Sequence, residues 1–93
     1  MEIKDLSRSA ILENLAEECA ELAHAALKEA RRLRGENPTP ATAEECRTAL
    51  AEEAADVTNM IGLAIEMGSI DKTEVACLMA EKMARFVKRL KEA

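Results

Sequence analysis

The sequence predicts an all-α protein, and three observations support this fold class. Residues with high helix propensity dominate the chain, namely Ala, Leu, Glu, Lys, Arg and Met. No stretch shows the sustained apolar–polar alternation of a half-buried strand. Two short segments contain the glycines and prolines that end helices, which divides the chain into three helical parts. With 93 residues there is room for one small domain, so we expect residues 1–93 to form a single antiparallel helical bundle.

The first helix is expected from about Ser7 to Arg34. It ends at the segment GENPTPAT, because one glycine and two prolines in close succession cannot continue a helix. Its apolar side is formed by Ile11, Leu15, Leu22, Ala26 and Leu33.

The second helix is expected to begin after Thr42. Thr42 and Glu45 have the spacing of a capping box, in which each side chain bonds the backbone N–H of the other residue. This helix should reach about Met67, where Gly68 ends it.

The third helix is expected from Asp71 to about Lys91, since Asp71 and Glu74 repeat the capping-box spacing. Three helices of this length form an open layer whose apolar face needs a cover. A homo-oligomer, either a homodimer or a homotetramer, is the economical way to cover it. The apolar face is rich in methionine and contains Met60, Ile61, Ile65, Met67, Leu78, Met79 and Met83.

Composition excludes several classes of partner. A net charge of −5 and the presence of a single aromatic residue, Phe86, argue against nucleic-acid binding. No apolar run is long enough to span a membrane, and the charged N-terminus lacks a signal-peptide core, so a cytoplasmic location is expected.

The three cysteines are far apart and are interpreted as reduced thiols in the core. The only histidine, His24, stands alone, which gives a zinc site little support.

Two acidic pairs occupy equivalent places on the first two helices. At about 100° per residue, Glu18 lies at the edge of the apolar side and Glu21 lies one turn further on. The second helix repeats this arrangement with Glu53 and Asp56. Antiparallel packing of the two helices would therefore bring the four carboxylates together.

Four carboxylates in a shared, partly dry site must take up protons or hold a cation. Oxygen ligands without His or Cys favour a hard ion, Mg²⁺ or Mn²⁺. The alternative is that these glutamates form a solvated helix face with i,i+4 partners such as Lys28.

The acidic motifs EECAE, with Glu17, Glu18 and Glu21, and EAAD, with Glu53 and Asp56, resemble the E-E-x-x-E…E-x-x-D signature of MazG-like all-α NTP pyrophosphatases. The resemblance extends from about residue 12 to residue 85. The surrounding sequence is similar to that of the small stand-alone members of the family. It implies Mg²⁺-dependent hydrolysis of a nucleoside triphosphate between the α- and β-phosphates, giving a nucleoside monophosphate and pyrophosphate.

The resemblance also implies roles for individual residues. Glu18, Glu21, Glu53 and Asp56 match the metal-ligand positions, and Glu17 is the glutamate that would hold or activate the attacking water. Candidates for binding the substrate are Asn59, Lys82 and Arg85, and the alternative for the two basic residues is a solvated helical face.

The chain departs from the family pattern in two respects. The gap between Glu21 and Glu53 is long, and the fourth helix of many members is missing. A non-catalytic helical interaction module is the competing hypothesis, supported by the methionine-rich face. Base and sugar preference and the number of metal ions stay open.

Overall fold

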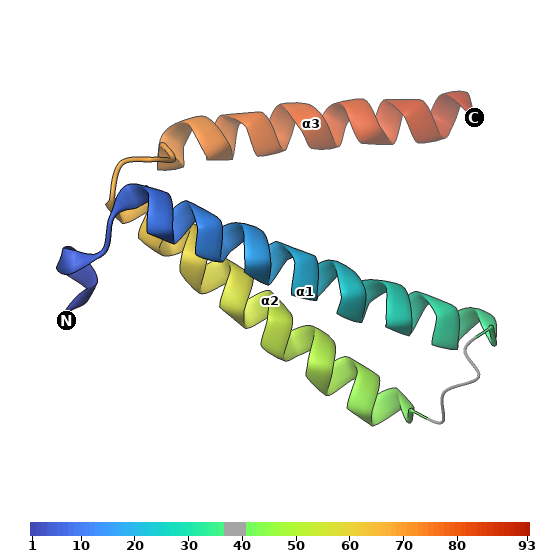
Figure 1. The fold of residues 1–93 in the computed structure, drawn as a ribbon. Helices are drawn as coiled ribbons and strands as arrows, with labels where there is room; N and C mark the ends of the chain where they lie inside the picture. Colours follow the sequence, from blue (N-terminus) through green and yellow to red (C-terminus); the bar gives the residue numbers. More distant parts are fainter. Residues whose placement is uncertain (37–40) are drawn as a thin grey trace.

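The computed structural model describes residues 1–36 and 41–93 and contains three long helices (Figure 1). A short 3-10 helix, η1 (Ile3–Asp5), precedes α1 (Arg8–Arg34), α2 (Ala43–Glu66) and α3 (Lys72–Glu92). The described residues include no strand, so the predicted all-α fold is confirmed. The two prolines expected to end the first helix lie outside the described residues.

The ends of α1 are set by local backbone chemistry. The Ser7 hydroxyl accepts a hydrogen bond from the backbone N–H of Ala10 at 3.1 Å, which satisfies one free donor of the first turn. Gly35 follows the last turn with φ 71°, a left-handed conformation that glycine adopts without steric cost, and its N–H bonds the carbonyls of Arg31 and Arg32. The predicted boundaries of this helix are confirmed.

The capping boxes of α2 and α3 differ. Thr42 Oγ1 accepts from Glu45 N at 3.0 Å, and Glu45 Oε1 accepts from Thr42 N at 3.2 Å, so the box predicted for α2 is confirmed. At the start of α3, Asp71 Oδ1 accepts from Glu74 N at 2.8 Å. The return bond from Glu74 does not form, so the second half of that predicted box is wrong.

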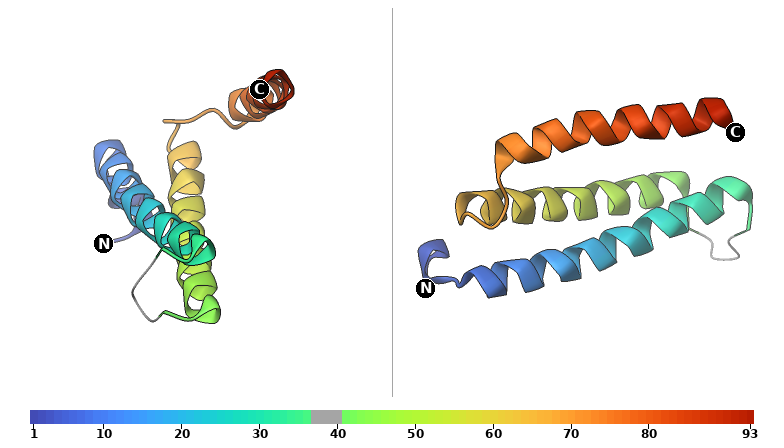
Figure 2. Two further views of the ribbon diagram at one scale, coloured as in Figure 1. Left: turned by 90° about the vertical axis from the view of Figure 1, so that its right-hand side faces the viewer. Right: turned by 90° about the horizontal axis from the view of Figure 1, so that it is seen from above.

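Helices α1 and α2 run antiparallel and pack against each other at a crossing angle, as Figures 1 and 2 show. The sequence placed Ala26 and Leu33 on the apolar side of α1, but both are exposed. The contact involves the neighbouring Ala25 instead. Among the described residues the core is small and comes from these two helices, with the buried residues Ile11, Ala25, Cys46, Val57 and Ala64.

Helix α3 stands away from the α1–α2 pair in every view (Figure 2) and contributes no buried residue. The radius of gyration is 16.7 Å, whereas a compact chain of this length has about 12 Å. An apolar stripe on α3, which we call the α3 stripe, is exposed as a result. It consists of Leu78, Met79, Met83, Phe86, Val87 and Leu90. Homo-oligomerisation, which would cover this stripe, stays a prediction.

Two other features bear on the expectations from sequence. All three cysteines are free thiols, but only Cys46 is buried, so the prediction that Cys19 and Cys77 are core residues is wrong for the single chain. No helix within the described ranges is both long and apolar enough to cross a membrane.

Candidate metal centre

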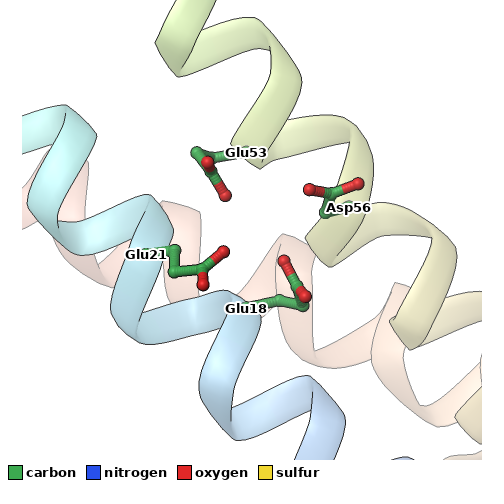
Figure 3. Close-up of side chains that lie close together, drawn as sticks. All are labelled: Glu18, Glu21, Glu53 and Asp56. Carbon is green, nitrogen blue, oxygen red and sulfur yellow. The ribbon is translucent and has the colours of Figure 1, made fainter.

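Four carboxylates from α1 and α2 meet on one side of the helix pair. Glu18 and Glu21 come from α1, and Glu53 and Asp56 come from α2. One carboxylate oxygen of each residue lies within 4.8 Å of such an oxygen of every other. Figure 3 shows the four side chains pointing toward one another. We call this group the carboxylate cluster.

The local sequence explains why these residues converge. Leu15 and Leu22 are half-buried on α1, one turn before and one turn after Glu18. On α2, Leu50 and Val57 flank Glu53 at the same distances along the chain, and Val57 is buried. Packing of these apolar side chains therefore holds the Glu18 and Glu53 backbones beside the helix contact.

Each helix supplies one half-buried and one exposed carboxylate. Glu18 and Glu53 are half-buried, whereas Glu21 and Asp56 are exposed. The cluster is therefore closed toward the core and open toward solvent, the side from which a ligand would approach.

Two oxygens of the cluster are buried without a hydrogen-bond partner, Oε2 of Glu18 and Oε2 of Glu53. Buried polar atoms in native proteins nearly always have a partner, so each exception calls for a physical explanation. Within the described part of the chain, none of the four residues forms an ion pair with a lysine or arginine. A cation bound among them would satisfy both oxygens.

The surroundings also disfavour the ionised forms of the two half-buried groups. Burial raises the pKa of the Glu18 carboxyl above its ordinary value, and the charges of Glu21 and Asp56 raise it further. For Glu53, burial again makes the largest contribution to a raised pKa, followed by the charges of Glu21 and Asp56. A divalent cation at this position would reverse this preference and keep both groups ionised.

The donor set fits a hard divalent ion. All the candidate ligand atoms are carboxylate oxygens, which Mg²⁺ and Mn²⁺ prefer. Opposite ligands of octahedral Mg²⁺ are about 4.2 Å apart, twice a bond length of about 2.1 Å. The oxygens of the cluster, which all lie within 4.8 Å of one another, are close to that separation.

The other residues singled out in the sequence lie outside the cluster. Glu17 is exposed on α1 and is not among the converging carboxylates, and Asn59 is exposed on α2 one turn after Asp56. Lys82 and Arg85 are exposed on α3, where they line a shallow surface hollow of their own helix. The fold of one chain does not bring these basic residues into the α1–α2 pair. His24 is exposed and takes no part in the cluster.

Sequence reasoning missed a hollow between α1 and α2, beside the carboxylate cluster. Its lining residues are Ala25, Lys28, Ala41, Glu45, Cys46 and Ala49. A signal was present, since alanines stand four residues after Glu21 and four residues before Glu53. Small side chains at facing positions leave space between two helices, but only the packing shows that this space stays open.

Comparison with known protein families agrees with the site. The family model of the MazG nucleotide pyrophosphohydrolase domain matches residues 6–90, which is nearly the whole chain. The chain belongs to the MazG family. This domain is all-α, as the structure is, and MazG domains are nucleotide pyrophosphohydrolases that generally depend on a divalent metal ion. No curated protein and no solved structure matches the chain.

Proposed function

We propose that this MazG domain hydrolyses a nucleoside or deoxynucleoside triphosphate between its α- and β-phosphates. The products are the nucleoside monophosphate and pyrophosphate. The observation that supports this function best is the carboxylate cluster with its two unpartnered buried oxygens, in a chain matched to this family over residues 6–90.

In this proposal Glu18, Glu21, Glu53 and Asp56 are the ligands of Mg²⁺, or of Mn²⁺ in its place. When bound, the ion would neutralise negative charge on the phosphates, which is the main requirement of phosphoanhydride cleavage. The open side of the cluster, formed by the exposed Glu21 and Asp56, is where the triphosphate would approach.

The reaction needs a water molecule aligned with the bond that breaks. The water oxygen attacks the α-phosphorus, the bond from that phosphorus to the bridging oxygen breaks, and pyrophosphate leaves with the bonding electrons. We assign Glu17 to accept the proton of the water. Glu17 is adjacent to Glu18 but extends from α1 in a different direction.

The substrate phosphates also need cations from the protein. We assign this role to Lys82 and Arg85, and we assign Asn59 to a polar contact with the substrate. Because α3 stands away from the α1–α2 pair, Lys82 and Arg85 would act on the carboxylate cluster of a second copy. Whether that assembly is a homodimer or a homotetramer does not affect the assignment.

The test is hydrolysis of a panel of NTPs and dNTPs with Mg²⁺, followed through pyrophosphate release. The Glu53→Gln variant should lose about 100-fold or more in kcat/KM, because a metal ligand contributes several kcal/mol to the stability of the transition state. Glu52→Gln is the matched control, since Glu52 is exposed, adjacent and outside the cluster. Equal activity of the two variants would refute the ligand assignment.

A non-catalytic interaction module is the second candidate, and the exposed α3 stripe favours it. Absence of pyrophosphate release from every nucleotide tested would support this function over hydrolysis. We also propose a cytoplasmic location, which is part of both candidate functions.

A further inference from the structure

The hollow between α1 and α2 is lined largely by small side chains and has polar residues at its rim. Its lining includes Ala25, Ala41 and Ala49, whose side chains are single methyl groups, and the volume is about 240 Å³. The Cys46 thiol, which is 4% exposed, also lines it. We call this hollow the alanine pocket.

The alanine pocket lies beyond the carboxylate cluster along the same faces of α1 and α2. On α1, Ala25 follows Glu21 by four residues, which corresponds to about 6 Å along the axis. On α2, Ala49 precedes Glu53 by the same number of residues. Positions four residues apart share one face of a helix, so the pocket begins one turn beyond the cluster on both helices.

Two further lining residues repeat this relation at the next turn. Lys28 follows Glu21 by seven residues, and Cys46 precedes Glu53 by seven residues. A spacing of seven returns to nearly the same heading, because two helical turns take about 7.2 residues. The pocket therefore extends from the cluster toward the connection between α1 and α2.

A larger hollow lies elsewhere on the described residues. It has a volume of about 540 Å³ and is lined by Ile3, Lys4, Arg8, Glu66 and Met67. Arg8 precedes Glu18 by ten residues, about 15 Å along α1. A ligand there would not be adjacent to the carboxylates, so we do not connect that hollow with the reaction.

The alanine pocket suits one flat ring system. Pockets that enclose a drug-sized ligand have volumes of about 300–1,000 Å³, so this one would take part of a nucleotide rather than all of it. Its methyl walls match the apolar faces of a base. Its rim offers a cation that only donates hydrogen bonds, Lys28, and a carboxylate that accepts them, Glu45. A nucleobase edge carries both acceptors and donors.

We propose that the alanine pocket binds the base of the nucleotide whose phosphates lie at the carboxylate cluster. This inference rests on the proposed pyrophosphohydrolase function and adds a site for base selection to it. Thr42 N donates to one oxygen of Glu45 at 3.2 Å, which orients the carboxylate, and the second oxygen accepts from the base. Lys28, which is half-buried, donates to a carbonyl or ring nitrogen of the base. An edge of the base is thus recognised by two charged groups.

The test fills the pocket without touching the carboxylates. Ala49→Leu places a larger side chain in the hollow, and Ala51→Leu is the control, because Ala51 is exposed on α2 and does not line the pocket. We expect Ala49→Leu to lower kcat/KM for nucleotides about 10-fold or more, mainly through a higher KM. Thermal stabilisation by Mg²⁺ in the absence of nucleotide should stay as in the parent protein, since the cluster is unchanged.

A second variant keeps the inference testable if Ala49→Leu does not fold. Lys28→Met removes the donor at the rim and should change the ratio of kcat/KM values between bases in the NTP panel, while the response to Mg²⁺ alone persists. If the parent protein cleaves nucleotides and both variants keep its kcat/KM for every base, the base pocket is refuted and the hydrolase function stands. If the parent cleaves no nucleotide, both proposals fail together.

Discussion

Glu18 and Glu53 are subject to two opposing requirements. To hold a cation they must be ionised, but their burial and the neighbouring carboxylates raise the pKa of each above its ordinary value of 4.5. In the absence of metal, ionising them therefore destabilises the folded chain. One buried oxygen of each of these two residues has no hydrogen-bond partner, which is a structural reason why the ionised forms are unfavourable.

This cost predicts how the metal-free protein responds to pH. As the pH rises above about 4.5, the unfolded chain releases the Glu53 proton before the folded chain does, because the folded pKa is raised. The folded state then holds more protons than the unfolded state, so its stability falls until the pH exceeds the raised pKa. The Glu53→Gln variant avoids this loss. In EDTA at pH 7 we expect its Tm to exceed that of the parent, with the difference shrinking toward pH 4.5.

Magnesium should reverse the order of the two proteins. At a Mg²⁺ concentration of 100 times its Kd, the parent protein gains about 2.7 kcal/mol of stability through preferential binding to the folded state. Glu53→Gln should gain much less, because one ligand is missing. Glu52→Gln serves as the control and should gain as much stability from Mg²⁺ as the parent, because all four ligands remain. A parent protein whose Tm does not respond to Mg²⁺ at neutral pH would rule out a metal centre of useful affinity.

At the scale of the helices, stability at the start of α2 depends on one pair of residues. Thr42 and Glu45 satisfy each other's backbone N–H groups at the end of α2 that adjoins the alanine pocket. Thr42→Ala should lower the free energy of unfolding by about 1 kcal/mol, measured by urea denaturation at a fixed protein concentration. Thr48→Ala, an exposed change inside the same helix, should alter it by less than about 0.5 kcal/mol. Equal losses in the two variants would show that the cap contributes nothing specific.

The helices themselves were predictable because their ends are decided locally. Ser7, Thr42 and Asp71 cap the first turn with their own side chains, and Gly35 ends α1 through its own backbone. The carboxylate cluster was predictable for a related reason. A rotation of about 100° per residue fixes the heading of each glutamate relative to the apolar side, and packing of the two apolar sides then determines the rest.

What the sequence did not reveal depends on contacts between distant residues. Periodicity indicates that one face of α3 is apolar but does not say what covers it, and in the single chain nothing in the described residues does so. Cys19 and Cys77 were expected in the core for the same reason, because apolar neighbours in sequence do not ensure burial. The alanine pocket was missed because it is defined by how closely two helices approach.

At the scale of the whole molecule, the α3 stripe should determine the state of assembly. The α3 stripe exposes large apolar side chains, with Met79 at 66% and Met83 at 61%. A charge placed there opposes burial strongly. We expect the parent protein to be a homodimer or homotetramer by light scattering and Met83→Glu to dissociate toward the monomer. Glu81→Gln, an exposed change on the same helix, should leave the molar mass unchanged. A monomeric parent would contradict the expected assembly.

In the proposed assignment, assembly also decides whether the substrate site is complete. The carboxylates lie on the α1–α2 pair, whereas Lys82 and Arg85 lie on a helix that stands away from it. If α3 of one copy serves the cluster of another, two inactive variants should restore each other. Glu53→Gln lacks a metal ligand but keeps the basic residues, and the double variant Lys82→Met with Arg85→Met has the reverse defect.

Refolding the two variants together in equal amounts should recover roughly one quarter of the parent activity in a homodimer, because half of the dimers are mixed and each mixed dimer has one intact site. Each variant refolded alone provides the baseline. If Lys82 and Arg85 instead served the carboxylates of their own chain, every site in a mixed dimer would carry a defect, because one chain lacks Glu53 and the other lacks both basic residues. Activity would then stay at the baseline. The recovered fraction therefore distinguishes a site shared between copies from one built within a single chain.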